Sequence, residues 1–228
     1  LVKQGYSDTD IASQLLQCAE RYLKEKGAEQ IYAAGVGAIC PFYLGLYGGS
    51  DLPGIIESDT RRRLFFEEHG YAEVDRALLY RRDLIGFRPT LDRALLQIRR
   101  TSTVIFITDP PSRSWWDACN QGCFHQIRAD LLPIGGGQPT ATAVFWDMES
   151  LVDPETRSRT TGLCNLKVDT NEPKSEMPRY LLSEALRHLQ SQGFVSVQGF
   201  AMQSDSATID LLKSVGFEQF GSGAVLRK

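Results

Sequence analysis

Apolar residues recur at helical spacing in two segments that lie far apart along the chain. Both segments carry paired leucines followed by an alanine and a further leucine: Leu15, Leu16, Ala19 and Leu23 in the first, and Leu181, Leu182, Ala185 and Leu189 in the second. Residues with this spacing share one face of a helix, so each segment predicts an amphipathic helix. Gly27 and Gly193 follow at the position where a glycine commonly ends a helix.

The same distribution of apolar and polar positions predicts the other elements. Further helices are expected at residues 59–71, 88–100, 113–124 and 205–217. Runs rich in β-branched or alternating apolar residues predict strands at residues 28–36, 72–84, 101–108, 125–134, 140–149, 160–168, 194–202 and 218–228. Helices and strands therefore alternate along much of the chain.

Two blocks of the sequence resemble two later blocks without gaps and in the same order. Residues 2–27 align with residues 168–193, and residues 59–71 align with residues 205–217. In each copy a polar loop leads into the amphipathic helix, a strand follows, and a second helix ends at a glycine-aromatic pair. We interpret these blocks as an internal duplication, which determines how the whole chain is organised.

The duplication divides the chain into one partial and one complete copy. We expect residues 1–87 to form the C-terminal half of the first copy and residues 101–228 to form the complete second copy. Residues 88–100 are expected to form a helix that links them. A sheet without its early strands exposes an edge, and such an edge must be covered.

The first copy carries an extra segment between its two helices. The glycines that end these helices are 43 residues apart in the first copy and 23 residues apart in the second. The extra segment contains Phe42, Tyr43 and Tyr47, with Gly48 and Gly49 beside them. Its content of glycine, proline and aromatic residues excludes a regular helix, and long loops often carry function. The aromatic residues either wall an acceptor pocket or pack over the other copy.

Composition and charge exclude several classes of protein. The chain of 228 residues has a net charge of −3 and a pI of about 5.7, which argues against a nucleic-acid-binding protein. No apolar run approaches the ~20 residues of a membrane span, and the start shows no signal-peptide pattern. Five cysteines, an odd number, suit reduced thiols, so we expect a cytoplasmic protein. Cys119, Cys123 and His125 lack the spacing of a zinc site, and no metal is expected.

The order strand, loop, helix, strand, helix, strand resembles the GNAT-type N-acetyltransferases. The resemblance extends to the loop before the amphipathic helix, where the family pattern is Arg/Gln-x-x-Gly-x-Gly/Ala. It implies an α/β fold with a mixed sheet, an α+β arrangement, in which two GNAT-like copies stand in tandem and the N-terminal copy is partial. It also implies an acyltransferase that uses acetyl-CoA as co-substrate and acetylates a small-molecule or peptide amine by direct attack.

The loop of the first copy is the acetyl-CoA site that this resemblance favours. Ala12 occupies a family position, but Asp10 stands where the family has its first glycine. In the family, backbone N–H groups of the loop and the helix N-terminus hold the pyrophosphate. The residues implied in binding are Val2, Asp8, Thr9, Asp10, Ile11, Ala12 and Ser13. A carboxylate at a helix start either caps the helix or repels a phosphate, so the role of Asp8 and Asp10 stays open.

The loop of the second copy departs further from the family pattern. Glu176 and Pro178 occupy both of its glycine positions, and Pro178 has no backbone N–H to donate. The first copy is therefore favoured as the cofactor site.

The residues that would handle protons also differ from the family pattern. Many family members have a tyrosine seven residues after the start of the later helix, but this chain has Phe66 and Leu212 there. Direct attack by an amine depends on positioning more than on covalent help, so the reaction survives this loss. The catalytic candidates are Tyr43, Tyr47 and Glu57, with Asp51, Asp147 and Glu149 as further candidates for the base.

Two other interpretations remain open at this point. The departures in both loops are also typical of a catalytically inactive tandem GNAT-like module that binds a ligand or a partner. A nucleotide-binding α/β protein of another type would need a Walker or Rossmann glycine pattern, and the sequence contains neither. The sequence indicates no nucleic-acid or membrane partner, and it leaves a homo-oligomer open.

Overall fold

The computed structural model describes residues 10–33, 54–89, 92–112, 115, 118, 124–148, 159–168 and 176–228. Its helices are α1 (Asp10–Glu25), α2 (Thr60–Glu68), α3 (Arg93–Thr101), α5 (Met177–Ser191) and α6 (Ser206–Ser214). Its strands are β1 (Tyr32–Ala33), β2 (Ile55–Ile56), β3 (Ala72–Asp83), β4 (Ser102–Thr108), β5 (Gln126–Pro133), β6 (Ala141–Asp147), β7 (Thr160–Val168), β8 (Ser196–Met202) and β9 (Glu218–Arg227). These elements confirm the predicted order of helices and strands. The short helix predicted at 113–124 lies mostly outside the described residues.

All described strands belong to one nine-stranded sheet. Its order is β1-β9-β3-β8-β7-β6-β5-β4, and β2 also pairs with β9. Neighbours run antiparallel except β7 and β8, which are parallel and joined through α5. The fold is therefore α/β with a mixed, mostly antiparallel sheet. Within the described residues, no helix is long and apolar enough to cross a membrane.

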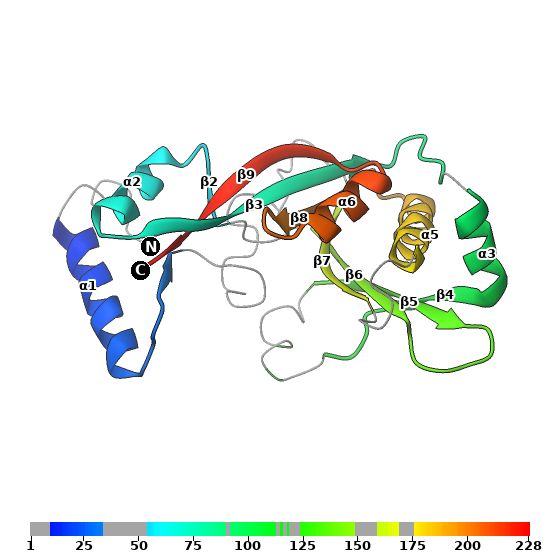
Figure 1. The fold of residues 1–228 in the computed structure, drawn as a ribbon, viewed down its shortest axis with the longest axis horizontal. Coiled ribbons are helices and arrows are strands. Elements are labelled where there is room, and N and C mark those ends of the chain that lie inside the picture. The colour runs from blue at the N-terminus through cyan, green and yellow to red at the C-terminus, as the bar shows by residue number, and fades with distance from the viewer. Residues whose placement is uncertain are drawn as a thin grey trace.

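The strands that end the two predicted copies are exchanged within this sheet. Strand β3, which ends the first copy, lies between β8 and β9 of the second copy and pairs with both. Strand β9, which ends the second copy, extends beyond this region and pairs with β1 and β2 of the first. Figure 1 shows β3 and β9 running side by side between the two ends of the molecule. Each copy therefore depends on a strand that the other copy supplies.

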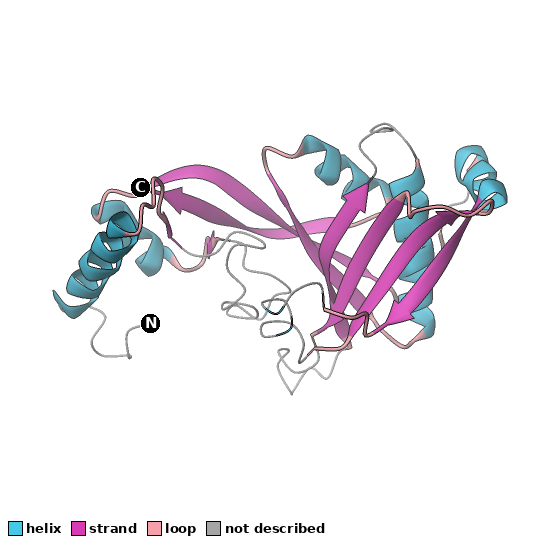
Figure 2. Cartoon of the chain, turned by 90° about the horizontal axis from the view of Figure 1, so that it is seen from below, coloured by secondary structure: helices cyan, strands magenta, loops and turns pink. Residues whose placement is uncertain are grey.

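The larger hydrophobic core lies mainly in the second copy, and Tyr80, Leu84 and Phe87 of the first copy also belong to it. Strands β5 and β6 direct their alternate apolar residues, such as Ala129, Leu131 and Phe145, toward α5. Figure 2 shows the strands of this half as a twisted sheet with helices packed along it. A smaller core, in the first copy, consists of Ile31, Ala33, Ile55, Tyr71, Ala224 and Leu226. Two of its residues come from β9, so the second copy completes the core of the first.

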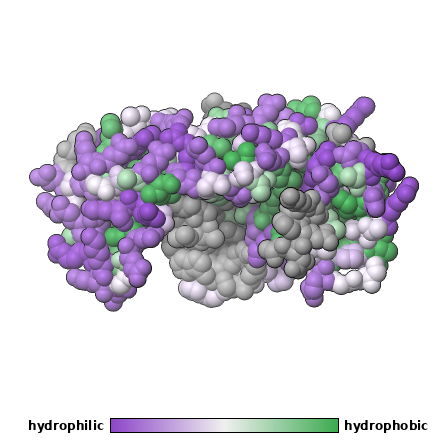
Figure 3. Space-filling view, in the orientation of Figure 1, coloured by the Kyte–Doolittle hydropathy of each residue, from purple (hydrophilic) through white to green (hydrophobic). Residues whose placement is uncertain are grey.

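The two repeated amphipathic helices differ in how far their apolar sides are buried. On α5 the four predicted apolar positions are all fully or nearly fully buried: Leu181, Leu182, Ala185 and Leu189. On α1 the equivalent Leu15 is 55% exposed and Leu23 is 39% exposed, so the two helices share the predicted amphipathic pattern but not the degree of burial. The reason is that α5 lies against β5 and β6, whereas β1 and β2 are two residues each. Figure 3 shows mainly hydrophilic side chains over the α1 end, with small hydrophobic areas between them.

A buried carboxylate holds α1 in place. Glu20 is 8% exposed and accepts hydrogen bonds from Lys228 Nζ at 3.1 and 2.9 Å. Burial by itself raises the pKa of Glu20, but the hydrogen bonds from Lys228 and Tyr71 outweigh it, and the pKa lies below that of an ordinary glutamate. Burial and the Glu20 carboxylate raise the pKa of Tyr71. Lys228, which follows β9, thus links α1 to the sheet through Glu20.

We expect Glu20→Gln to lower the free energy of unfolding at neutral pH by about 1 kcal/mol. A carboxylate whose pKa falls on folding stabilises the protein above its unfolded pKa, and this contribution is lost as the pH falls through the folded value. Urea denaturation at neutral pH and below about pH 4 measures the effect. Glu25→Gln, an exposed change on the same helix, is the control. An equal loss of stability on acidification in wild type and Glu20→Gln contradicts the prediction.

Candidate functional site

Strands β7 and β8 separate from each other and leave a wedge between them. They pair only at Thr160–Ser196, Thr161–Val197 and Gly162–Gln198. Both strands then continue, over residues 163–168 and 199–202, without a further ladder pair among the described residues. Each strand remains paired on its outer side, β7 with β6 and β8 with β3. On the sides that face each other, the backbone N–H and C=O groups of these stretches therefore have no ladder partner among the described residues, and an extended ligand could pair with them.

Buried hydrogen bonds stabilise the closed end of the wedge, where β7 and β8 still pair. Thr160 and Ser196 share a hydrogen bond of 2.9 Å between their hydroxyl oxygens. Thr161 donates to the backbone oxygen of Trp146 at 2.8 Å. Gly199 follows the last pair, and a Cβ added to it would lie 3.5 Å from the Leu163 Cβ. The strands therefore begin to separate at a defined level of the sheet.

A β-bulge lies on β7 at this same level. Val144 of β6 is opposite Asn165, and Phe145 is opposite Leu163, so Cys164 is an extra residue on β7. Its thiol donates to the backbone oxygen of Val144 at 3.3 Å. The extra residue of a bulge interrupts the ladder and redirects backbone groups, and bulges are common beside active sites.

Helix α5 begins at the open end of the wedge, because it follows β7 and runs back along the sheet to β8. Glu176 is its N-cap and makes no side-chain capping bond. Arg179 in the first turn bonds Asp92 at 2.7 Å and Glu176 at 3.1 Å. Hydrogen bonding to Glu176 and Asp92 raises the pKa of Arg179. A guanidinium cation therefore stands where the helix dipole also favours an anion.

Asp92 connects this helix start to α3. Its carboxylate caps α3 by accepting from the backbone N–H of Leu95 at 3.0 Å. The bond to the Leu95 N–H and the contact with Arg179 lower the pKa of Asp92. The carboxylate is therefore ionised at neutral pH and holds one side of the Arg179 guanidinium.

The acetyl-CoA residues predicted in the first copy lie partly outside the described residues. Val2, Asp8 and Thr9 fall there, so their roles stay predictions. The structure places the other four in the first turn of α1: Asp10, Ile11, Ala12 and Ser13. The loop and the strand before this helix are also outside the described residues. The structure therefore does not test whether the first copy has a wedge of its own.

Ser13 contacts the end of α2. The Nδ1 of His69 lies 2.7 Å from the backbone oxygen of Phe65, so this nitrogen carries the proton and donates. In the neutral ring the Nε2 then accepts, and Ser13 Oγ lies 3.0 Å from it. The hydroxyl of Ser13 therefore ties the start of α1 to α2.

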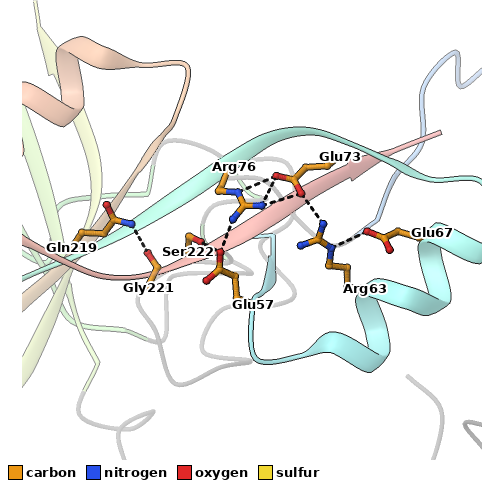
Figure 4. A network of polar contacts seen from close by, with 8 residues as sticks. All are labelled: Glu57, Arg63, Glu67, Glu73, Arg76, Gln219, Gly221 and Ser222. Carbon is orange, nitrogen blue, oxygen red and sulfur yellow. Dashed lines mark hydrogen bonds and ion pairs between the residues drawn. The ribbon is translucent and has the colours of Figure 1, made fainter.

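The predicted base Glu57 belongs to a network of charged residues. Arg76 contacts both Glu57 and Glu73, and Ser222 donates to Glu57 at 2.7 Å. Arg63 extends the network by contacting Glu73 at 3.1 Å (Figure 4). Glu57 therefore holds its ion pair with Arg76 of β3 and its hydrogen bond with Ser222 of β9, so strands from both copies fix it. Its role as a base stays a prediction.

The other proton-transfer candidates fall into two groups. Tyr43, Tyr47, Asp51 and Glu149 lie outside the described residues. Leu212 of α6 is fully buried, and Phe66 of α2 packs edge-on against Tyr71 with ring centroids 5.1 Å apart. Neither residue offers a hydroxyl at the position where the family resemblance expects a tyrosine. Asp147 is on β6, and its role as the base stays a prediction.

Sequence reasoning missed the features that define the wedge. The strand at 160–168 was predicted, but a local pattern does not show where its parallel pairing ends. The Arg179–Asp92 contact joins residues far apart in the chain, and the bulge at Cys164 has no local signature. The one local feature that could have indicated an anion-binding site is Arg179, a basic residue in the first turn of α5.

Comparisons with known proteins identify similar folds. No protein-family model matches the chain, and no curated protein matches it in sequence. A structure described as a GCN5-related glucosamine N-acetyltransferase region of a fungal multi-domain GH3 β-N-acetylglucosaminidase is similar with a TM-score of 0.71 at 15% identity. The match covers 100% of this chain and 29% of that one.

Two further structures show the same likeness. A tandem GNAT protein from the clavulanic acid biosynthesis pathway has a TM-score of 0.64 at 10% identity, over 100% of this chain and 72% of that one. A GCN5-related N-acetyltransferase from Sphaerobacter thermophilus has a TM-score of 0.57 at 14% identity, over 100% and 70%. The chain therefore has the fold of the GCN5-related N-acetyltransferases in a tandem arrangement.

Proposed function

We propose that this protein is an N-acyltransferase that binds acetyl-CoA in the wedge between β7 and β8. The observation that carries the proposal is the end of β7–β8 pairing at Gly162 and Gln198, with both strands continuing beyond it. An extended arm with amide groups pairs with the open backbone of residues 163–168 as an added strand would. Arg179 at the start of α5 then provides a cation near the phosphates.

The chemistry follows from this placement. The thioester lies near the bulge at Cys164, where redirected backbone groups meet its carbonyl oxygen. The neutral amine nitrogen attacks the carbonyl carbon, a C–N bond forms, the C–S bond breaks, the thiolate of CoA leaves with the electron pair, and the proton that the nitrogen loses passes to solvent. Holding the two reactants in line supplies much of the acceleration in such a reaction.

A non-catalytic module is the second candidate, and the start of α5 favours it. Glu176 places a carboxylate beside the expected phosphates, and Pro178 removes one of the N–H groups of the first turn. In that case the tandem fold binds a ligand or a partner and transfers no acetyl group. Binding and turnover measured on the same protein distinguish the two candidates.

Calorimetric titration of acetyl-CoA into wild type, Glu176→Gln and Asp10→Asn tests the site. Each substitution removes one carboxylate from the start of one repeated helix, so the pair compares the two copies directly. We expect Glu176→Gln to strengthen binding about fivefold, because a repulsive charge is lost and Arg179 gains freedom. Asp10→Asn is expected to leave binding unchanged. The reverse result places the cofactor in the first copy, and no binding by any of the three contradicts the proposal.

The acceptor is tested by release of CoA thiol in the presence of amines. Glucosamine belongs in the panel because the region with the TM-score of 0.71 is described as a glucosamine N-acetyltransferase. A lysine-containing peptide and a peptide with a free N-terminus represent the other amine classes. Binding of acetyl-CoA without thiol release for any amine favours the non-catalytic candidate.

A further inference from the structure

A buried tyrosine hydroxyl on β3 has no hydrogen-bond partner. Tyr80 is 1% exposed, and its hydroxyl oxygen is one of three buried side-chain atoms without a partner in the described structure. The other two belong to Arg82 and Trp146. Arg82 bonds the backbone oxygen of Gly216 through its Nη1, and Trp146 packs against Phe124. Buried polar groups are almost always satisfied, so an orphaned hydroxyl indicates a missing partner.

The register of the sheet places Tyr80 at the level where the wedge begins. Tyr80 of β3 lies directly opposite Gly199 of β8, so both residues face the same side of the sheet. Gly199 is the first residue of β8 beyond its last pair with β7. On its other side lies Leu163, the first residue of β7 beyond that pair. Tyr80 and Leu163 therefore flank a position that has no side chain.

This face is enclosed by helices of the second copy. Tyr80 belongs to the same core cluster as Leu163, Leu181 of α5 and Leu212 of α6. A hydroxyl among such side chains finds few protein partners, because the surroundings are apolar. A ligand that enters between β7 and β8 brings carbonyl and amide groups to the same level of the sheet.

We propose that the Tyr80 hydroxyl donates a hydrogen bond to a carbonyl oxygen at the thioester end of the bound acyl-CoA arm. The inference rests on the proposed function and adds that the first copy contributes a residue to the site of the second. Strand exchange is what brings it there, since β3 lies beside β8 only because it is inserted between β8 and β9. Leu212 of α6 leaves the expected tyrosine position without a hydroxyl, and Tyr80 supplies one from strand β3.

The test is Tyr80→Phe, which removes one oxygen and keeps the ring. We expect acetyl-CoA affinity to fall about fivefold to tenfold, because a buried hydrogen bond to the ligand is lost. Adenosine 3′,5′-bisphosphate, which lacks the arm, is expected to bind wild type and Tyr80→Phe equally. The unliganded variant is expected to melt about 2–4 °C higher, since an unsatisfied hydroxyl has been removed.

Tyr71→Phe is the matched control, because the Tyr71 hydroxyl bonds Glu20 in the first copy. It is expected to lower the melting temperature and leave acetyl-CoA affinity unchanged. Equal acetyl-CoA affinity of wild type and Tyr80→Phe overturns the inference alone and indicates a buried water as partner of the hydroxyl. An equal loss for acetyl-CoA and the bisphosphate also overturns it. Absence of acetyl-CoA binding by wild type overturns the proposed function and, with it, the inference.

Discussion

Leu181→Ala is expected to lower the free energy of unfolding by about 2–5 kcal/mol. Leu181 is fully buried on α5 within the larger core, and truncation leaves a cavity that the surrounding side chains fill only in part. Urea denaturation followed by circular dichroism measures the loss. A change below about 1 kcal/mol contradicts the packing of α5 on the sheet.

Leu15→Ala is the matched control, because Leu15 occupies the equivalent position in the repeat. Its side chain is 55% exposed on α1, so we expect a change within about 0.5 kcal/mol. A loss as large as that of Leu181→Ala means that another surface covers α1 in solution. In that case stability should rise with protein concentration, because a second copy of the chain would be the cover.

Gly54→Ala is expected to cost more than about 3 kcal/mol and to separate β2 from β9. Gly54 has φ +75, and a Cβ there would collide with the backbone oxygen of Ala224 and lie 2.9 Å from its carbonyl carbon. A backbone neighbour within a ladder has little freedom to move aside. Hydrogen exchange of the Ile55 and Ile56 amides, together with urea denaturation, measures both effects.

Gly86→Ala separates the two causes of this loss. Gly86 has φ +70, but no atom lies within 4 Å of an added Cβ, so only the backbone conformation is penalised. We expect a cost of about 1 kcal/mol for that conformation alone. Similar losses of unfolding free energy in Gly54→Ala and Gly86→Ala would show that the backbone of β9 moves aside at Ala224. The close approach of Gly54 to Ala224 would then not be essential.

The two copies depend on each other for stability, and these variants measure that dependence. Strand β9 supplies Ala224 and Leu226 to the smaller core, and it pairs with β3, whose Tyr80 belongs to the larger core. Substitution of Gly54 therefore destabilises the smaller core first, and substitution of Leu181 destabilises the larger core first. The long β3–β9 pair is the structural connection between them.

The order of the helices and of the main strands follows from local patterns in the sequence. Helical spacing of leucines marked α5 and α1, and aspartates marked the starts of α2 and α6, where Asp59 and Asp205 accept from backbone N–H groups. These features are local, because periodicity and capping depend on residues within a few positions of one another. The family resemblance that followed from them agrees with the fold.

Which apolar faces are buried, and where the wedge opens, depend on contacts between distant segments of the chain. Leu15 and Leu181 have the same local pattern, yet one is exposed and the other buried, because burial depends on the strands that lie beneath each helix. The pairing of Tyr80 with Gly199 and the end of the β7–β8 ladder at Gly162 join segments distant in the chain. Strand pairing between distant segments leaves no mark on neighbouring residues, so the exchange of β3 and β9 emerges only when the whole sheet is assembled.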